Sequence, residues 1–365
     1  DPVTAIRALR LRSDVNQTSQ YCSKNVPDAN SWLELTESSI KTTVSVITDM
    51  IVQCEKGSND TLTTSDRDKI INSLKQLKSE VYSTGDADFA GRYIFAGYRT
   101  ETSLSFKDNT KQTYTITELF KANDIKQETY VECANLSSLS ESNYETGTGP
   151  AIMQQDIDAN PYYKIRMSYS NIDSTNTPTQ VTMNGTTYAV NLATDKNAAY
   201  ADAANDSGVY FIPSTGELVF GKSVFDDAKN STDNISITYD KTNWVSGDLR
   251  PQHYFYCETV DEDGNVITFN DDDKDNDGQI DYFKTGTVDQ SIEYQVGFNQ
   301  YIRVNTNANE VFKHSIGRDI DDLMNLADTL SKMEDIQSKL KLMSTNTTIY
   351  SASEIDNIKL DLDAA

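Results

Sequence analysis

Residues 26–54, VPDANSWLELTESSIKTTVSVITDMIVQC, carry an apolar side chain at every seventh position. The series consists of Val26, Leu33, Ile40, Ile47 and Cys54. Residues three, four and seven apart lie on one side of an α-helix, so this period predicts a single long helix over residues 28–56 with one apolar face. The run Gly57-Ser58-Asn59-Asp60 then ends it.

Two more helical regions follow from the same spacing. A second helix is predicted from the cap Thr64-Ser65-Asp66 to Gly85. The last 50 residues repeat the pattern from Ile316 to Met343, and a short helix begins near Ser353. We predict that both chain ends pack together along a seam, although an ordinary helical bundle has the same period. The seam residues are Leu33, Ile40, Ile47, Leu323 and Leu330.

The middle of the chain is predicted to form short β-strands joined by turns such as Asn184-Gly185 and Asp263-Gly264. Residues 197–205 fit either a short helix or a loop. The predicted strands are Tyr163–Tyr169, Val181–Met183, Tyr188–Leu192, Val209–Ile212, Leu218–Phe220, Ile235–Tyr239, Tyr254–Glu258, Val266–Phe269 and Gln279–Phe283.

This pattern predicts an α+β fold, in which an elongated helical bundle built from both chain ends carries a large inserted β-rich domain. Residues 1–106 would form the N-terminal helices and a β-hairpin of the helical domain. Residues 107–300 would form the inserted outer domain, with a sub-boundary near residues 147–150. Residues 301–365 would return to the helical domain.

The chain has 365 residues, with 32 basic and 56 acidic side chains and a net charge of -24. Residues 101–315 alone carry a net charge of -18. This charge argues against binding to nucleic acid or to an anionic membrane, since both would repel the chain. The first residues are not a secretory signal peptide, and without a Met they suggest a fragment of a longer protein.

No catalytic motif is found in the sequence, so we expect no enzyme and no organic cofactor. The two histidines, His253 and His314, do not form a zinc-peptidase motif. His253 and Cys257 are four residues apart, and a packed strand explains that spacing better than a nucleophile with its base. Cys133 would pair with Cys257 only if their strands were neighbours, and free thiols are the preferred interpretation.

An acidic run is the candidate metal site. Alternating aspartates precede Gly278 in the manner of a calcium-binding loop, but Lys284 stands where an EF-hand needs a glutamate. Two interpretations stay open, a calcium site in a β-hairpin and a solvated acidic turn. The candidate ligands are Asp273, Asp275, Asp277 and Asp281.

Several short motifs resemble the flagellin superfamily. The segment Gly91–Thr100, GRYIFAGYRT, is similar to the one that follows the second helix in its hook–filament junction subfamily, and we take Gly91, Tyr93, Phe95 and Gly97 as its structural signature. Weaker matches complete the resemblance, which covers residues 1–106 and about 290–343. They are Arg7-Ala8-Leu9, Trp32-Leu33, Gly247–Pro251 and Arg303–Ala308.

The resemblance implies a structural adaptor that joins hook and filament of the bacterial flagellum and assembles as a ring. The implied partners are flagellin, the hook-associated protein next to the hook, and further copies of the chain. It implies an extracellular location, reached through the flagellar secretion apparatus without a cleaved signal peptide. Because the family's polymerising terminal segments are not in this sequence, we expect a monomer. A flagellin subunit and a ligand- or cation-binding surface module are the alternatives.

Overall fold

The protein is described by a computed structural model over residues 2–57, 62–149, 151–152 and 157–365, and its fold is α+β. It divides into two compact units. The first comprises residues 1–60, 72–116 and 241–317, and the second comprises residues 61–71, 117–240 and 318–365. This division differs from the expected one, because residues 107–116 and 241–300 group with the N-terminal helices. Residue 150, at the expected sub-boundary, lies outside the described residues.

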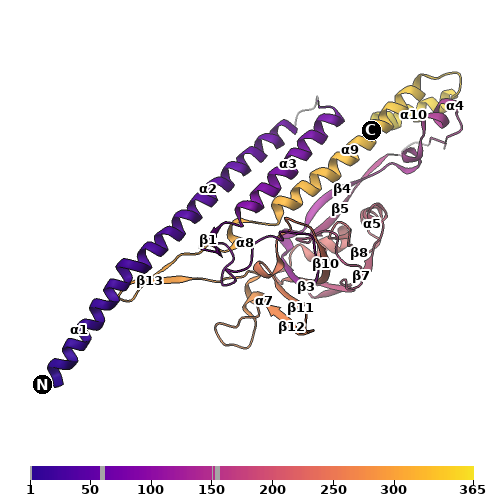
Figure 1. The fold of residues 1–365 in the computed structure, drawn as a ribbon. Coiled ribbons are helices and arrows are strands. Elements are labelled where there is room, and N and C mark those ends of the chain that lie inside the picture. The colour runs from indigo at the N-terminus through magenta and orange to yellow at the C-terminus, as the bar shows by residue number, and fades with distance from the viewer. Residues whose placement is uncertain (1, 58–61, 150, 153–156) are drawn as a thin grey trace. The chain divides into compact units, whose positions relative to one another are not determined.

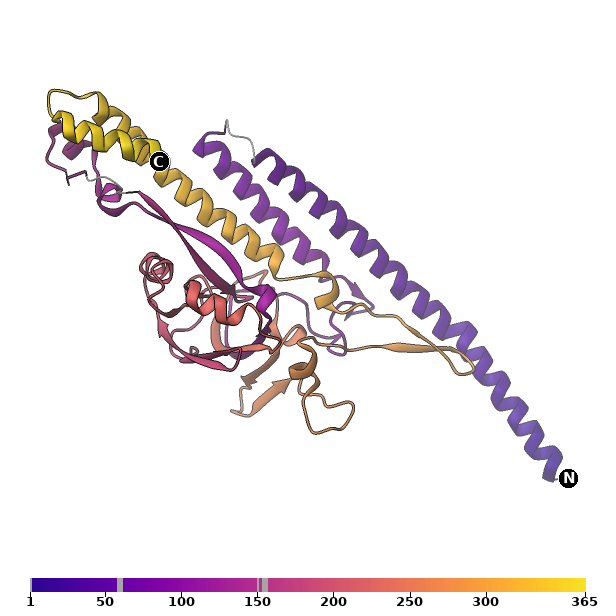
Figure 2. The same ribbon diagram turned by 180° about the vertical axis from the view of Figure 1, so that it is seen from behind.

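A long N-terminal helix dominates the first unit. It is formed by α1 (Pro2–Gln20), the π-helical turn η1 (Tyr21–Asn25) and α2 (Val26–Gly57), which follow one another without a break (Figure 1). Residues 72–84 of α3 (Thr64–Thr84) run back beside α2, as the opposite view in Figure 2 also shows. The helices predicted at both positions are confirmed.

The β structure of the first unit consists of two hairpins and a sheet. The hairpins are β1 (Asp88–Phe89) with β2 (Arg92–Tyr93), and β13 (Glu293–Gly297) with β14 (Gln300–Arg303). The sheet has the strand order β10 (Ile235–Trp244), β3 (Thr110–Phe120), β11 (Tyr256–Val260) and β12 (Val266–Phe269), and β10 and β3 extend into the second unit. Short helices η4 (Pro251–His253), α7 (Asp281–Thr285) and α8 (Ala308–Val311) complete the unit.

One apolar core joins segments of the first unit that are far apart in sequence. Helix α2 contributes Trp32 and Val46, and partly buried Ile40 and Ile47 pack against this core. The other buried members come from α3, from the segment after the first hairpin and from residues 249–312. They include Val81, Tyr82, Ile94, Phe95, Leu104, Leu249, Val304, Ala308 and Phe312.

The seam prediction is wrong for Leu33, whose side chain is 37% exposed. The buried row of α2 instead contains small and hydroxyl side chains, which a search for apolar residues passes over. Ser39 Oγ donates to the carbonyl oxygen of Thr84 (2.7 Å), and the hydroxyls of Thr43 and Thr84 are 2.6 Å apart. Since these groups keep their hydrogen bonds, they are buried without penalty. The buried row is Ala29, Trp32, Thr36, Ser39, Thr43 and Val46.

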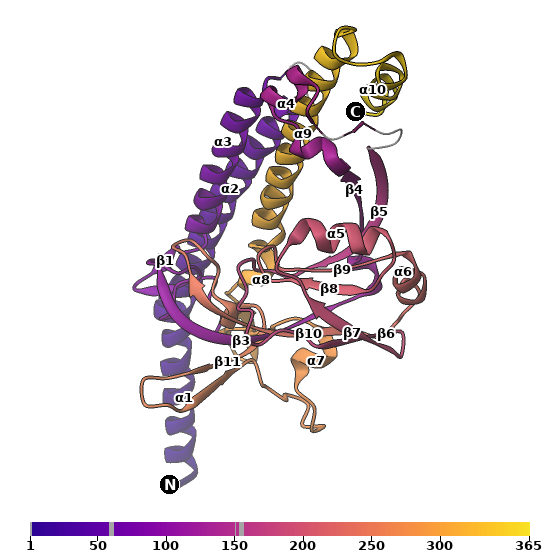
Figure 3. The ribbon, with the colours of Figure 1, turned by 90° about the vertical axis from the view of Figure 1, so that its right-hand side faces the viewer.

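The second unit contains a six-stranded sheet that is covered by short helices (Figure 3). Its strand order is β4 (Lys126–Glu132), β5 (Asp158–Arg166), β9 (Glu217–Phe220), β8 (Val209–Ile212), β7 (Thr186–Leu192) and β6 (Gln180–Met183). Helix α5 (Lys196–Ala204) packs on Tyr162, whereas Phe225 of α6 (Lys222–Ala228) stacks on Tyr163. Successive strand residues face opposite sides, so the two helices cover the two faces.

The C-terminal helices of the second unit form a separate core with the segment that follows β4. Helix α9 (Ser315–Thr345), of which residues 318–345 belong here, contributes Ile336, Leu340 and Met343, and α10 (Ala352–Ala364) contributes Ile358. They pack on residues of the short helices η3 (Ala134–Ser138) and α4 (Glu141–Thr146), while η2 (Ala122–Asp124) precedes β4. Both C-terminal helices were predicted and are confirmed.

The seam prediction is also wrong for Leu323 and Leu330, which are 38% and 41% exposed. Within the second unit, the residues of α9 from Arg318 onward contact β5 and the segment after it through charged side chains instead of leucines. Asp322 pairs with Lys164 of β5, at 3.2 Å, and Arg318 Nε donates to the carbonyl oxygen of Met167 at 3.1 Å. A helix face that carries these ion pairs turns its leucines toward solvent.

Candidate functional site

The signature Gly91–Gly97 forms a tight hairpin. Ala90 and Gly91 occupy its two-residue turn with φ angles of 52° and 79°, as a type I′ turn requires, and Gly91 N donates to Asp88 Oδ2 at 3.1 Å. The β-hairpin predicted within residues 1–106 is confirmed. Gly97 has φ 60°, and a Cβ atom there would lie 2.3 Å from Oε1 of Gln290.

The hairpin and the segment after it connect the N-terminal helices to residues 290–312. The guanidinium of Arg92 lies 5.2 Å from the ring centre of Trp32, and the Phe95 ring meets Phe312 edge to face at 4.9 Å. Tyr98 N donates to Oε1 of Gln290 at 2.9 Å. Tyr93 is half-buried and Phe95 is buried, so the signature residues hold this unit together.

Helix α1 has a different character, because every described side chain from Thr4 to Gln20 is exposed. Four of them are large and apolar, with exposed fractions of 54–65%. These apolar side chains are spread around the helix and do not form one stripe. Among the described residues, no helix has the length and apolarity that crossing a membrane demands. The four side chains are Ile6, Leu9, Leu11 and Val15.

The acidic run is not the tip of a β-hairpin. The strand predicted over Gln279–Phe283 is wrong, since Asp281 begins the helix α7, which Gly286 ends with φ 69°. Carboxylate oxygens of Asp273, Asp275 and Asp281 lie within 4.8 Å of one another, whereas Asp277 is not part of this group. The loop bends because Asp273 accepts hydrogen bonds from the backbone of residues 277 and 278.

An internal ammonium group neutralises these carboxylates. Lys284 Nζ lies 2.7 Å from Asp275, 2.8 Å from Asp277 and 3.2 Å from Asp281. Hydrogen bonds to these carboxylates raise the pKa of Lys284. The hydrogen bond that Lys284 donates to Asp275 is the main cause of the lowered pKa of Asp275. A metal ion would have to displace this lysine, and calcium binding stays a prediction.

The pair His253 and Cys257 is not arranged for catalysis. His253 Nε2 lies 3.0 Å from the carbonyl oxygen of Ser103, which only accepts, so Nε2 carries the proton. Burial lowers the pKa of His253 to about 4 and raises the pKa of the Cys257 thiol. Cys257 is a buried free thiol and Cys133 a partly buried one, in agreement with the preferred interpretation.

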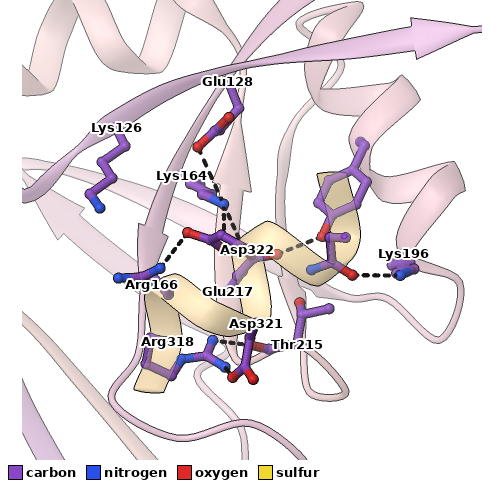
Figure 4. A network of polar contacts seen from close by, with 12 residues as sticks. Lys126, Glu128, Lys164, Arg166, Lys196, Thr215, Glu217, Arg318, Asp321 and Asp322 are labelled. Carbon is purple, nitrogen blue, oxygen red and sulfur yellow. Dashed lines mark hydrogen bonds and ion pairs between the residues drawn. The ribbon is translucent and has the colours of Figure 1, made fainter. Parts of the chain in front are cut away.

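An ion-pair network in the second unit was not predicted from the sequence (Figure 4). Lys164 Nζ lies 3.0 Å from Glu217 and 3.6 Å from Glu128, and Arg166 pairs with Asp322. Burial opposes the charge of Lys164, but the surrounding carboxylates outweigh it and raise its pKa. Two basic residues at alternate positions of a predicted strand were the available signal, because a buried face with this charge needs acidic partners.

Comparison with known proteins points to one family. Residues 1–100 match the model of the bacterial flagellin N-terminal helical region. Flagellar hook-associated protein 3 of Escherichia coli (strain K12) is 32% identical over 104 residues, which cover 28% of this chain and 32% of that protein. The chain therefore matches about a third of the length of this curated relative.

Two crystal structures of Xanthomonas campestris FlgL align with most of the chain. The form in space group C2 is 14% identical, covers 96% of this chain and 95% of its own, and has a TM-score of 0.27. The form in space group H3 is 11% identical, covers 95% and 99%, and has a TM-score of 0.25.

Proposed function

We propose, from the similarity of residues 1–100 to the bacterial flagellin N-terminal helical region, that the protein is a structural adaptor that joins hook and filament of the bacterial flagellum. It would assemble as a ring, with flagellin on one side and the hook-associated protein next to the hook on the other. It acts outside the cell, after export through the flagellar secretion apparatus, and performs no catalysis.

The exposed apolar side chains of α1 are the observation that carries this proposal. Helix α1 continues into α2, but its described side chains make no buried contact, and its leucines lie in solvent. Burial of these apolar side chains against neighbouring subunits would stabilise the helix. The rigid hairpin core beside α2 would then hold the helix at a fixed position in each subunit.

Deletion and complementation in the source organism test the proposal. Without the adaptor, flagellin cannot attach to the hook. We therefore expect the deletion strain to carry hooks without filaments and to release flagellin into the medium. The full-length gene should restore filaments. A Leu9→Asp variant should fail, because it places a charge in the proposed subunit contact, whereas Gln17→Asp, also on the exposed helix, should succeed.

Two outcomes would contradict the proposal. If deletion leaves the filaments attached, the protein is not the adaptor. If the gene restores filaments to a strain that lacks flagellin, the protein is a filament subunit. Circular dichroism of the purified variants must show the parental helix content, so that loss of function reports assembly and not unfolding.

A further inference from the structure

A cavity of about 630 Å³ opens in the second unit between β4, α5 and α9. Its volume falls in the range of small-ligand sites, roughly 300–1,000 Å³. β4 is the outermost strand of the six-stranded sheet, so one of its edges has no neighbouring strand. The adaptor function proposed above does not use this cavity.

Side-chain contacts flank the cavity on two sides. At one end Lys164 and Arg166 pair with Asp322 of α9 (Figure 4). At the other, the Cys133 and Met333 sulfur atoms are 3.4 Å apart. Residues 322–333 of α9 span about 17 Å at 1.5 Å per residue. These contacts flank a space of about 630 Å³, which accommodates a compact ligand.

Tyrosine rings form one wall of the cavity. Tyr162 and Tyr200 are stacked with ring centres 5.0 Å apart, and partly buried Tyr130 packs against the same cluster. Tyr200 OH donates to Glu217 Oε2 at 2.6 Å, which fixes the orientation of its ring. Preorganised aromatic surface of this kind binds apolar faces of a ligand at a low cost in entropy.

The polar wall offers hydrogen-bonding groups but little unpaired charge. Lys164 is surrounded by Glu128, Glu217 and Asp322, and Lys196 Nζ donates to Asn325 Oδ1 at 3.1 Å. Among the described residues that line the cavity, five are acidic and three are basic. An anionic ligand would therefore be repelled, whereas a neutral ligand with many hydroxyl groups finds both donors and acceptors.

We propose that this cavity binds a compact neutral saccharide, such as a hexose or a disaccharide. The apolar face of the sugar ring lies against the tyrosine wall, and its hydroxyl groups replace water at Glu128, Lys196 and Asn325. No bond is made or broken, so the site is a binding site and not a catalytic one.

The test measures binding of neutral mono- and disaccharides to the complete chain by saturation-transfer NMR and calorimetry. The probes are glucose, galactose, mannose, N-acetylglucosamine and their common disaccharides. We expect at least one to bind, and Tyr200→Ala to weaken it tenfold or more. Tyr188→Ala is the matched control, because Tyr188 also donates to a carboxylate, Asp227 at 2.6 Å, but does not line the cavity.

A second variant guards against unfolding. Asn325→Ala removes an amide from the polar wall without emptying the tyrosine cluster, and it should weaken binding at least threefold at an unchanged melting temperature. The proposal is overturned if none of the saccharides binds, or if Tyr200→Ala and Tyr188→Ala bind equally well. The proposal is also overturned if extended peptides bind in the cavity and no saccharide displaces them.

Discussion

At the scale of single residues, Gly97 and Gly91 illustrate two reasons why a position requires glycine, namely a positive φ angle and the lack of space for a Cβ atom. Both have positive φ angles, but only at Gly97 would a Cβ atom clash, with Gln290. We expect Gly97→Ala to lower the free energy of unfolding by about 2–4 kcal/mol and Gly91→Ala by only about 1 kcal/mol. Urea denaturation of both variants measures this difference. Equal losses would show that Gln290 moves aside freely.

His253 gives a pH dependence with a definite sign. Burial depresses its folded-state pKa to about 4, below the unfolded value of about 6.5, so the unfolded chain binds the proton more tightly. The contribution of neutral His253 to the free energy of unfolding is therefore complete above pH 6.5, and it decreases as the pH falls toward 4. We expect the free energy of unfolding of His253→Gln to depend less on pH between pH 6.5 and 5 than that of the parent. An unchanged slope would place the titration elsewhere.

At the scale of elements, α2 shows what a periodicity can predict. The helix and its end at Gly57 follow from apolar spacing, but its continuation back to Pro2 does not. The buried face does not follow either, because hydrogen bonds let Ser39 and Thr43 enter the core. We expect Leu33→Ala to cost under about 1 kcal/mol and Trp32→Ala about 3–5 kcal/mol. Thermal melts of both variants measure the contrast. Equal losses of stability in the two variants would support the predicted burial of Leu33.

The structure of the acidic loop could not be predicted from the local sequence pattern alone. The alternating aspartates were visible in sequence, but the position of the Lys284 ammonium among them depends on α7 replacing the predicted strand. In Lys284→Met the carboxylates lose this partner. We expect calcium to raise the melting temperature of this variant more than magnesium does at equal ionic strength, because flexible oxygen ligands suit calcium. Equal shifts would mean that the ions only screen charge.

At the scale of the whole molecule, the α+β class and the helices of both chain ends could be predicted, because they depend on local periodicity. The division into units could not, since it depends on distant pairings such as β3 between β10 and β11. The ion pairs of Lys164 were hidden for the same reason, because Glu217 and Asp322 lie 53 and 158 residues away in sequence.

The net charge of -24 bears on the state of the isolated chain. Electrostatic repulsion between copies opposes their association in solution. At micromolar concentration and physiological salt, light scattering should give a mass near 40.8 kDa. A stable ring or filament at that concentration would contradict this prediction.

The position of the protein on the flagellum tests the central claim most directly. Purified flagella can be labelled with gold-conjugated antibodies raised against the second unit and imaged by electron microscopy. The adaptor proposal predicts gold in a narrow band between hook and filament, and none along the filament shaft. Label distributed along the whole filament would identify a filament subunit and contradict the account.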